Sequence, residues 1–277
     1  KGIPAIVKAI KTEVKMNQET KGYVFGKDAD YDDFTNVLRM SLVEFCMEVK
    51  KPLVILFDEV DCLSNGTLIT FLRQIREGYI NRSRYPFVHS VGLIGMRNIR
   101  DYKARVREDS QSLGSASPFN ITKKVMTLKN FSEKDIQDLY KQHTKETGQE
   151  FGDDVISQVY YYTKGQPWLV NAIAREIVEE ILERDTSKKI LPEYVAKAAS
   201  TIIKRRDTHI DSLLERLKED RVKKVMEPLI SGESTGFDML DDDYQYTVDL
   251  GLVTLLDKKI VISNPIYEEV ITRALNS

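Results

Sequence analysis

Short apolar runs, each followed by polar residues, mark the expected strands in the first part of the chain. Residues 53–57 (LVILF) are five consecutive apolar residues, preceded by Pro52 and followed at once by acidic residues. This pattern is typical of a parallel strand that is buried on both faces. The stretch at residues 88–94 (VHSVGLI) predicts a second buried strand, and residues 123–128 predict a shorter third one.

Amphipathic helices are expected around these strands and through the second half of the chain. Apolar side chains recur at helical spacing over residues 4–15, 34–46 and 68–79. Four aspartates crowd the start of the second of these helices, where they suit a helix N-terminus better than a metal site. From residue 131 the pattern is helical, with Ser132 placed to cap one helix and Pro167 near the first turn of another.

The tail follows a third pattern. Helices are expected over residues 194–204, 210–217 and 222–230, and a further one over residues 241–250. Two short apolar strands then flank the charged turn at residues 257–259. Helix, helix, strand, tight turn and strand is the order of a winged helix. The fold class expected from these patterns is α/β, with a parallel sheet domain at 1–130, a helical unit at 131–190, and a helical linker with a winged helix at 191–277.

The candidate chemistry lies directly after the first strand, at Asp58 and Glu59. Open α/β sheets bind ligands at the carboxyl ends of their strands. An aspartate at such a strand end can hold the water shell of a phosphate-bound Mg²⁺, and an adjacent glutamate can orient an attacking water. The alternative is a buried strand followed by solvated acids that cap the next helix.

A basic run that begins at Arg97 and Asn98 follows the second strand. It is compatible with a phosphate sensor, with an arginine that contacts a partner, or with a solvated helix face, and spacing alone does not separate the three.

Composition narrows the classes of partner. The chain has 277 residues, with 41 Lys and Arg against 43 Asp and Glu, so a net charge of −2 produces no global field that would attract nucleic acid or an acidic membrane. Its two cysteines, Cys46 and Cys62, give neither a disulfide framework nor a metal-binding spacing, which indicates a reducing, cytoplasmic setting. No apolar run approaches the length of a membrane span.

Several phrases together resemble one family. They are VILFDEVD, GMRNIRDYK, SLGSASPFN, LKNFSEKDI and TKGQPWLVNAIAREIVEEIL. In combination these resemble the AAA-like P-loop ATPases of bacteria and archaea, which belong with the AAA+ and STAND ATPases. The resemblance covers roughly residues 50 to 277. It implies a sheet domain that binds ATP with Mg²⁺, a helical lid and a C-terminal winged helix.

The resemblance also implies roles for particular residues. Asp58 matches the Walker B residue that holds magnesium, and Glu59 matches the catalytic glutamate. Arg97 or Asn98 lies where such proteins place a sensor for the γ-phosphate. The motif at Gly165, Gln166 and Pro167 resembles the lid motif whose proline lies against the nucleotide, with a turn in the core as the alternative role for that proline.

Two departures from the family pattern bear on function. The phosphate-loop signature GxxxxGK followed by Ser or Thr occurs nowhere in the chain, so the backbone cradle for the β- and γ-phosphates is lacking. We therefore expect a further N-terminal segment that supplies this loop and its central strand. The rival is a degenerate relative in which residues 1–27 fill the gap, with residues 21–26 (KGYVFG) as the only candidate strand there. Trp168 also replaces the sensor arginine that many AAA+ lids carry, and Arg175 lies two turns on.

Two hypotheses follow. In the first, the chain is most of an ATPase that works as an ATP-driven conformational switch, with ATP and ADP as ligands and an unidentified protein as its target. In the second, it is an interaction module that does not hydrolyse ATP. DNA is the less favoured partner, because the helix expected at 241–250 carries four aspartates and no basic residue. Sequence leaves open whether the chain forms a homo-oligomer.

Overall fold

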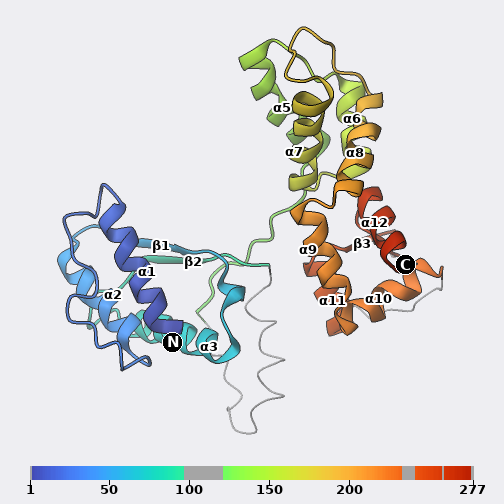
Figure 1. Cartoon of the computed structure of the whole chain (residues 1–277). Coiled ribbons are helices and arrows are strands. Elements are labelled where there is room, and N and C mark those ends of the chain that lie inside the picture. The colour runs from blue at the N-terminus through green and yellow to red at the C-terminus, as the bar shows by residue number, and fades with distance from the viewer. Residues whose placement is uncertain (1, 97–120, 233–240, 258, 276–277) are drawn as a thin grey trace. The chain divides into compact units, whose positions relative to one another are not determined.

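The computed structural model describes residues 2–96, 121–232, 241–257 and 259–275. The chain divides into two compact units, Lys1–Met126 and Thr127–Ser277 (Figure 1). Each unit has its own buried core of apolar side chains. The first unit contains the candidate chemistry at the end of a strand, and the second is almost entirely helical.

The first unit packs helices against one face of a small parallel sheet. Its elements are α1 (Gly2–Met16), α2 (Val37–Glu48), β1 (Val54–Phe57), the short 3₁₀ helix η1 (Val60–Cys62), α3 (Asn65–Ile80) and β2 (Ser90–Leu93). Strands β1 and β2 pair in parallel, with Val54 opposite Ser90 and Phe57 opposite Leu93. The predicted strands at 53–57 and 88–94 are therefore confirmed, and the sheet has the expected direction.

Burial along β1 differs from the prediction. Ile55 and Phe57 pack against the helical core, where the rings of Phe57 and Phe71 meet edge to face at 4.9 Å. Val54 and Leu56 point the other way and are 57% and 68% exposed. The expectation of a strand buried on both faces is wrong for the described part of the chain, because α1, α2 and α3 contribute their apolar residues to one core on one side of the sheet.

The third predicted strand, at residues 123–128, is not formed. The described sheet of this unit consists of β1 and β2 alone, and residues 121–132 have no regular secondary structure. Val125, Met126 and Leu128 are exposed. A strand needs a hydrogen-bonded neighbour, and no described strand lies beside this segment. Residues 21–26 do not pair with the sheet either, so the rival account of the sheet's centre is wrong.

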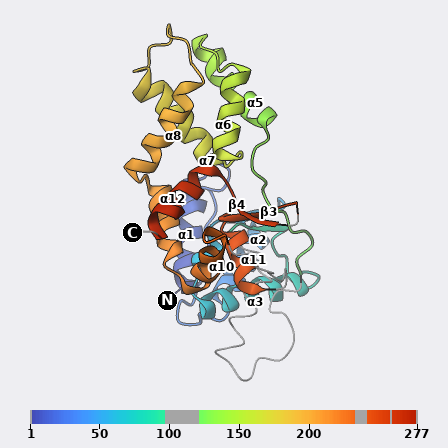
Figure 2. The same ribbon diagram turned by 90° about the vertical axis from the view of Figure 1, so that its right-hand side faces the viewer.

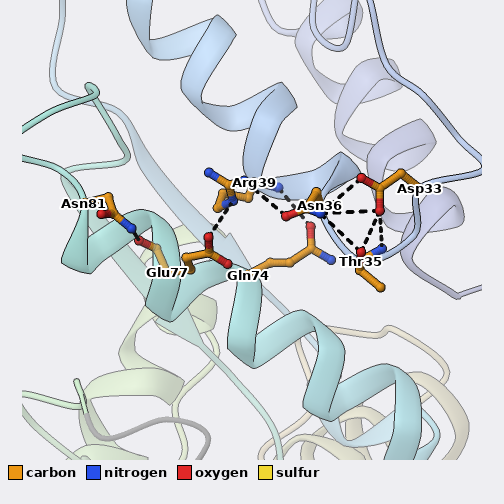
Figure 3. A network of polar contacts seen from close by, with 7 residues as sticks. All are labelled: Asp33, Thr35, Asn36, Arg39, Gln74, Glu77 and Asn81. Atoms are coloured by element: carbon orange, nitrogen blue, oxygen red, sulfur yellow. Dashed lines mark hydrogen bonds and ion pairs between the residues drawn. The ribbon is translucent and has the colours of Figure 1, made fainter.

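A polar network joins the start of α2 to α3 (Figure 3). Gln74 is 1% exposed; its side chain accepts a hydrogen bond from the backbone N–H of Arg39 and donates one to the carbonyl of Phe34, both at 3.0 Å. The Arg39 guanidinium donates to Asn36 at 3.1 Å and lies 3.5 Å from the carboxylate of Glu77. Gln74 thereby satisfies backbone groups at the start of α2 that no helix bond satisfies.

The second unit begins with a helical bundle. Ser132 and Asp135 form a capping box at the start of α5 (Glu133–Thr147), as the sequence predicts. The chain continues through α6 (Asp153–Thr163), α7 (Pro167–Arg175), the π-helical segment η3 (Glu176–Ile181) and α8 (Glu193–Arg205). Apolar residues from all these helices enter one core that extends into the tail.

The tail adds helices and a hairpin in the predicted order. These elements are α9 (Thr208–Leu217), α10 (Asp220–Ile230), α11 (Asp242–Asp249), β3 (Val253–Leu256), β4 (Lys259–Ile262) and α12 (Pro265–Leu275). Strands β3 and β4 pair antiparallel, with Val253 opposite Ile262. The hairpin packs beside α10 and α11, as Figure 2 shows. The core of the second unit runs without a break from α5 to α12.

Candidate functional site

The candidate site begins at the turn that follows β1. Asp58 and Glu59 are both exposed there. The Asp58 carboxylate accepts a hydrogen bond of 2.9 Å from the backbone N–H of Glu59. Glu59 has φ 52° and ψ 38°, a left-handed conformation that few residues other than glycine adopt. Non-glycine residues held in this conformation cluster at functional sites.

Backbone hydrogen bonds hold the ends of both strands at one edge of the sheet. The N–H of Ile94 donates to the carbonyl of Phe57 at 2.8 Å, and the N–H of Val60 donates to the carbonyl of Ile94 at 3.1 Å. The turn that carries Glu59 is therefore fixed against the residues that leave β2. This is the edge at which parallel sheets present ligand-binding groups.

The two carboxylates are available to a cation. Within the described ranges, neither forms an ion pair with a lysine or arginine. The Glu59 carboxylate accepts a hydrogen bond from the thiol of Cys62, whose Sγ lies 4.0 Å from Oε2. Carboxylate oxygens suit Mg²⁺, which usually keeps several of its own waters and takes few protein ligands. The carboxylate oxygens of Asp58 and Glu59 fit a Mg²⁺ ion that is bound through its own waters.

A cation held by the protein alone is a different case. Among the residues that the structure describes, no group of three or more His, Cys, Asp or Glu side chains is arranged to hold a metal ion. Asp58 with Glu59 therefore fits an ion that brings water or phosphate oxygens as its remaining ligands. The predicted sensor residues Arg97 and Asn98 lie outside the described residues.

The other predicted site residues form a turn in the second unit. Gly165 has φ +76°, and a Cβ atom there would collide with the backbone of Phe131. The Gln166 side chain caps α7 by accepting the N–H of Leu169 at 2.6 Å, and Pro167 occupies the first turn of that helix. All three residues therefore have a structural role in the turn that begins α7. A contact of Pro167 with nucleotide stays a prediction.

Sequence reasoning missed an aromatic cluster next to this turn. Trp168 stacks on His209 with ring centroids 4.6 Å apart and planes at 18°. His209 Nε2 lies 2.6 Å from the Tyr267 hydroxyl, so α7, α9 and α12 meet here. Burial lowers the pKa of His209 below its ordinary value. The partners lie up to 58 positions apart in sequence, and no local pattern announces such a contact.

A charged cluster joins the end of α7 to α8 and α9. Glu176, the first residue of η3, is 5% exposed and accepts a hydrogen bond of 2.9 Å from Arg205. Arg205 also binds both carboxylate oxygens of Asp207, at 2.6 and 2.9 Å, and this lowers the pKa of Asp207. Arg175 lies 4.0 Å from the same carboxylate. Arg205 is therefore a structural cation that joins Glu176 to Asp207.

Part of the acidic charge on α11 is compensated locally. Asp241 caps the helix by accepting the N–H of Asp243 at 2.7 Å. The Asp243 carboxylate is paired with Arg221 at 3.3 Å and with Lys224 at 3.2 Å, both from α10. The side chains of Arg221 and Lys224 are thus already paired with a carboxylate of this chain.

Comparisons with known proteins agree with the fold. Within the described ranges, no helix combines the length and the apolar character that crossing a membrane requires. A solved structure, the Walker-type ATPase PABY2304 of Pyrococcus abyssi, superimposes with a TM-score of 0.59 over 97% of this chain and 79% of that chain, at 13% sequence identity. At this identity the likeness concerns the fold. The comparison with curated proteins finds no match.

The family follows from the sequence. The profile of the AAA-like domain matches residues 35–273, which include the strand end at Asp58 and Glu59, the turn at Gly165 and most of the tail. The family and the solved structure together indicate a P-loop ATPase-like fold. This chain belongs to the AAA-like domain family.

Proposed function

We propose that this protein binds Mg·ATP at the carboxyl end of β1 and hydrolyses it, as a conformational switch of the AAA+ and STAND type. The observation that carries the proposal is the turn at Asp58 and Glu59. Both carboxylates are exposed and free of lysine or arginine partners in the described ranges, and Glu59 is held in a left-handed conformation. A purely structural strand end has no need for two adjacent carboxylates.

Each carboxylate has a separate role in this proposal. Asp58 holds the water shell of the Mg²⁺ that accompanies the β- and γ-phosphates. Glu59 orients the water that attacks the γ-phosphate and receives its proton. The hydrogen bond from the backbone N–H of Glu59 holds the Asp58 carboxylate against the turn that carries Glu59. Arg97 or Asn98 would report on the γ-phosphate from the end of β2.

The phosphates themselves need a cradle that residues 1–277 do not contain. We propose that a phosphate loop outside this stretch supplies it, together with a strand beside β2 and a helix over the open face of the sheet. The exposure of Val54 and Leu56 supports this, because apolar strand residues in a parallel sheet are normally covered.

The second unit is proposed to be the moving part. Residues 131–190 would form the lid over the nucleotide, with Pro167 against it, and residues 191–277 the linker and winged helix. The order of the helices and the hairpin in the tail supports a winged helix there. A protein target is favoured over DNA, because α11 presents aspartates and the cations Arg221 and Lys224 are engaged by Asp243. The cytosol is the proposed location, since Cys46 and Cys62 are both free thiols.

A second candidate is an interaction module without hydrolysis. The exposed apolar side chains on the sheet, Val54 and Leu56, favour it, because contiguous exposed apolar surface also marks protein interfaces. In that case Asp58 and Glu59 would be surface acids, and the protein would not bind Mg·ATP.

Calorimetric titration of Mg·ATP separates the two candidates. The titration compares the chain with a form that includes whatever the gene encodes before Lys1. Under the ATPase proposal the longer form binds Mg·ATP, and Glu59→Gln keeps the affinity while turnover falls by about a hundredfold or more. Glu13→Gln, an exposed carboxylate on α1, is the matched control and should change neither. Unchanged turnover in Glu59→Gln would remove the catalytic assignment, and absent binding in both forms would favour the interaction module.

A further inference from the structure

A third acidic residue, Asp61, extends the contact between the two strands beyond their ends. Backbone hydrogen bonds connect Ile94 with Phe57 and Val60. Further along the chain, a side chain makes the connection. The backbone N–H of Met96 donates to Asp61 Oδ2 at 3.4 Å. Asp61 lies on η1, two residues after Glu59. The carboxylate therefore ties the residues that leave β2 to the turn that carries Glu59.

Gly95 makes room for this carboxylate. A Cβ atom at position 95 would lie 2.8 Å from Asp61 Oδ1 and 3.3 Å from the side chain of Val60. The first distance is shorter than real Cβ contacts, so any side chain at 95 would displace the Asp61 carboxylate. Two independent observations, a hydrogen bond and a close approach, thus place Asp61 against the same two residues of the β2 exit.

Backbone hydrogen bonds close the turn that runs from Glu59 to Leu63. The N–H of Cys62 donates to the carbonyl of Glu59 at 2.9 Å, and the N–H of Leu63 donates to that of Val60 at 3.3 Å. Val60 is buried in the core of the first unit. A displacement of Asp61 relative to β2 therefore changes the relation of Glu59 to β2 as well.

We propose that Asp61 is a positioning residue for the hydrolytic step. It does not touch the nucleotide; it fixes the exit of β2 at a set distance from Glu59. The proposal rests on the ATPase function proposed above. Attack on the γ-phosphate needs the water oriented by Glu59 in one geometry relative to the carboxyl edge of the sheet, and a small misplacement of such a group slows a reaction strongly.

A purely structural role predicts a different result. The Asp61 bond to Met96 is long and exposed, so it contributes little to folding stability. Its loss should leave the fold intact and alter the rate. The Asp61→Asn variant keeps an oxygen that can accept the Met96 N–H, whereas Asp61→Ala does not. If Asp61 works through this hydrogen bond, Asn should restore much of what Ala loses.

The test uses the full-length protein and four variants. Asp61→Ala and Gly95→Ala should each lower kcat about tenfold with little change in KM, because the interaction serves the transition state. Asp61→Asn should lie close to the wild type. Gly66→Ala is the control, since an added Cβ there meets no atom within 4 Å. Hydrogen exchange at the Met96 amide, followed by NMR, should be faster in Asp61→Ala than in the wild type.

Each outcome has a defined meaning. Unchanged hydrogen exchange at Met96 in Asp61→Ala would overturn the positioning role. So would a kcat in both Asp61→Ala and Gly95→Ala that equals the kcat of the Gly66→Ala control. A loss of ATP affinity in place of kcat would also overturn it. If the wild type shows no turnover that depends on Glu59, the ATPase proposal fails, and the Met96 exchange still decides whether Asp61 holds the β2 exit.

Discussion

Gly165 and Phe131 meet main chain to main chain, with the N–H of Phe131 donating to the carbonyl of Gly165 at 2.8 Å. The contact joins the entry to α5 with the turn before α7. It leaves no room for a side chain at 165, and the positive φ there adds a second requirement for glycine.

Gly165→Ala should therefore destabilise the second unit by about 3 kcal/mol or more, because strain and a backbone collision act together. Gly148→Ala is the matched control: its φ is +77°, and an added Cβ meets nothing within 4 Å. The control should lose only about 1 kcal/mol. Denaturant unfolding followed by circular dichroism measures both, and equal losses would contradict the importance of the Phe131 contact.

Gln74 should be sensitive to an isosteric apolar replacement. Gln74→Leu fills similar space but leaves the Arg39 N–H and the Phe34 carbonyl without their buried partner. The expected loss of unfolding free energy is about 2 kcal/mol. Arg73→Ala, at an exposed position on the same helix, should change stability by less than about 0.5 kcal/mol. A Gln74→Leu protein as stable as the wild type would show that these backbone groups find other partners.

Arg205 should matter more for stability than its exposed neighbour. Arg205→Ala leaves the buried carboxylate of Glu176 without its cation, which we expect to destabilise the second unit by about 3 kcal/mol. Lys204→Ala removes an exposed charge from the same helix end and should be nearly neutral. In a double-mutant cycle, Glu176→Gln should recover part of the loss caused by Arg205→Ala. Additive losses would argue against direct coupling.

The only tryptophan should report the protonation of His209. Trp168 stacks on the His209 ring, and an imidazolium at that distance quenches indole fluorescence. Because burial lowers the folded pKa of His209, the quenching midpoint should lie below the ordinary value of about 6.5. A His209→Gln variant should abolish the titration, whereas replacement of His89 should leave it unchanged. A midpoint above the ordinary value would contradict the buried environment.

The same histidine links stability to pH, and the direction can be stated. The folded pKa is depressed, so the unfolded chain binds the proton more readily in the window just below about pH 6.5. The contribution of neutral His209 is fully present above that window and is lost as the pH falls through the folded pKa. The free energy of unfolding of the second unit should fall accordingly, and less steeply in His209→Gln.

Local sequence patterns predicted where helices and strands lie better than they predicted which segments pack or pair with them. The apolar run before Asp58 located β1, the residues at Ser132 and Pro167 located helix starts, and the charged turn at 257–259 located the hairpin. These signals act within a few residues, where backbone hydrogen bonding and side-chain period decide the structure. The predicted strand at 123–128 failed because strand formation depends on a neighbour, which composition does not reveal.

The candidate site was predictable only in part, for a similar reason. Asp58 and Glu59 stand out because a strand end concentrates them. The left-handed backbone of Glu59, the Asp61 contact with Met96 and the stacking of Trp168 on His209 depend on segments distant in sequence. Such contacts follow from how elements pack, and a single sequence carries no direct record of it.

The open face of the sheet has a practical consequence for work with this polypeptide. Val54 and Leu56 form an exposed apolar strip on β1. In the described part of the chain, each of the two strands has one neighbour and therefore one edge that pairs with no other strand. Strand edges next to apolar surface recruit other chains, which makes them sites of aggregation. Preparations of residues 1–277 should therefore scatter more light as concentration rises, and lysine in place of Leu56 should keep them clear.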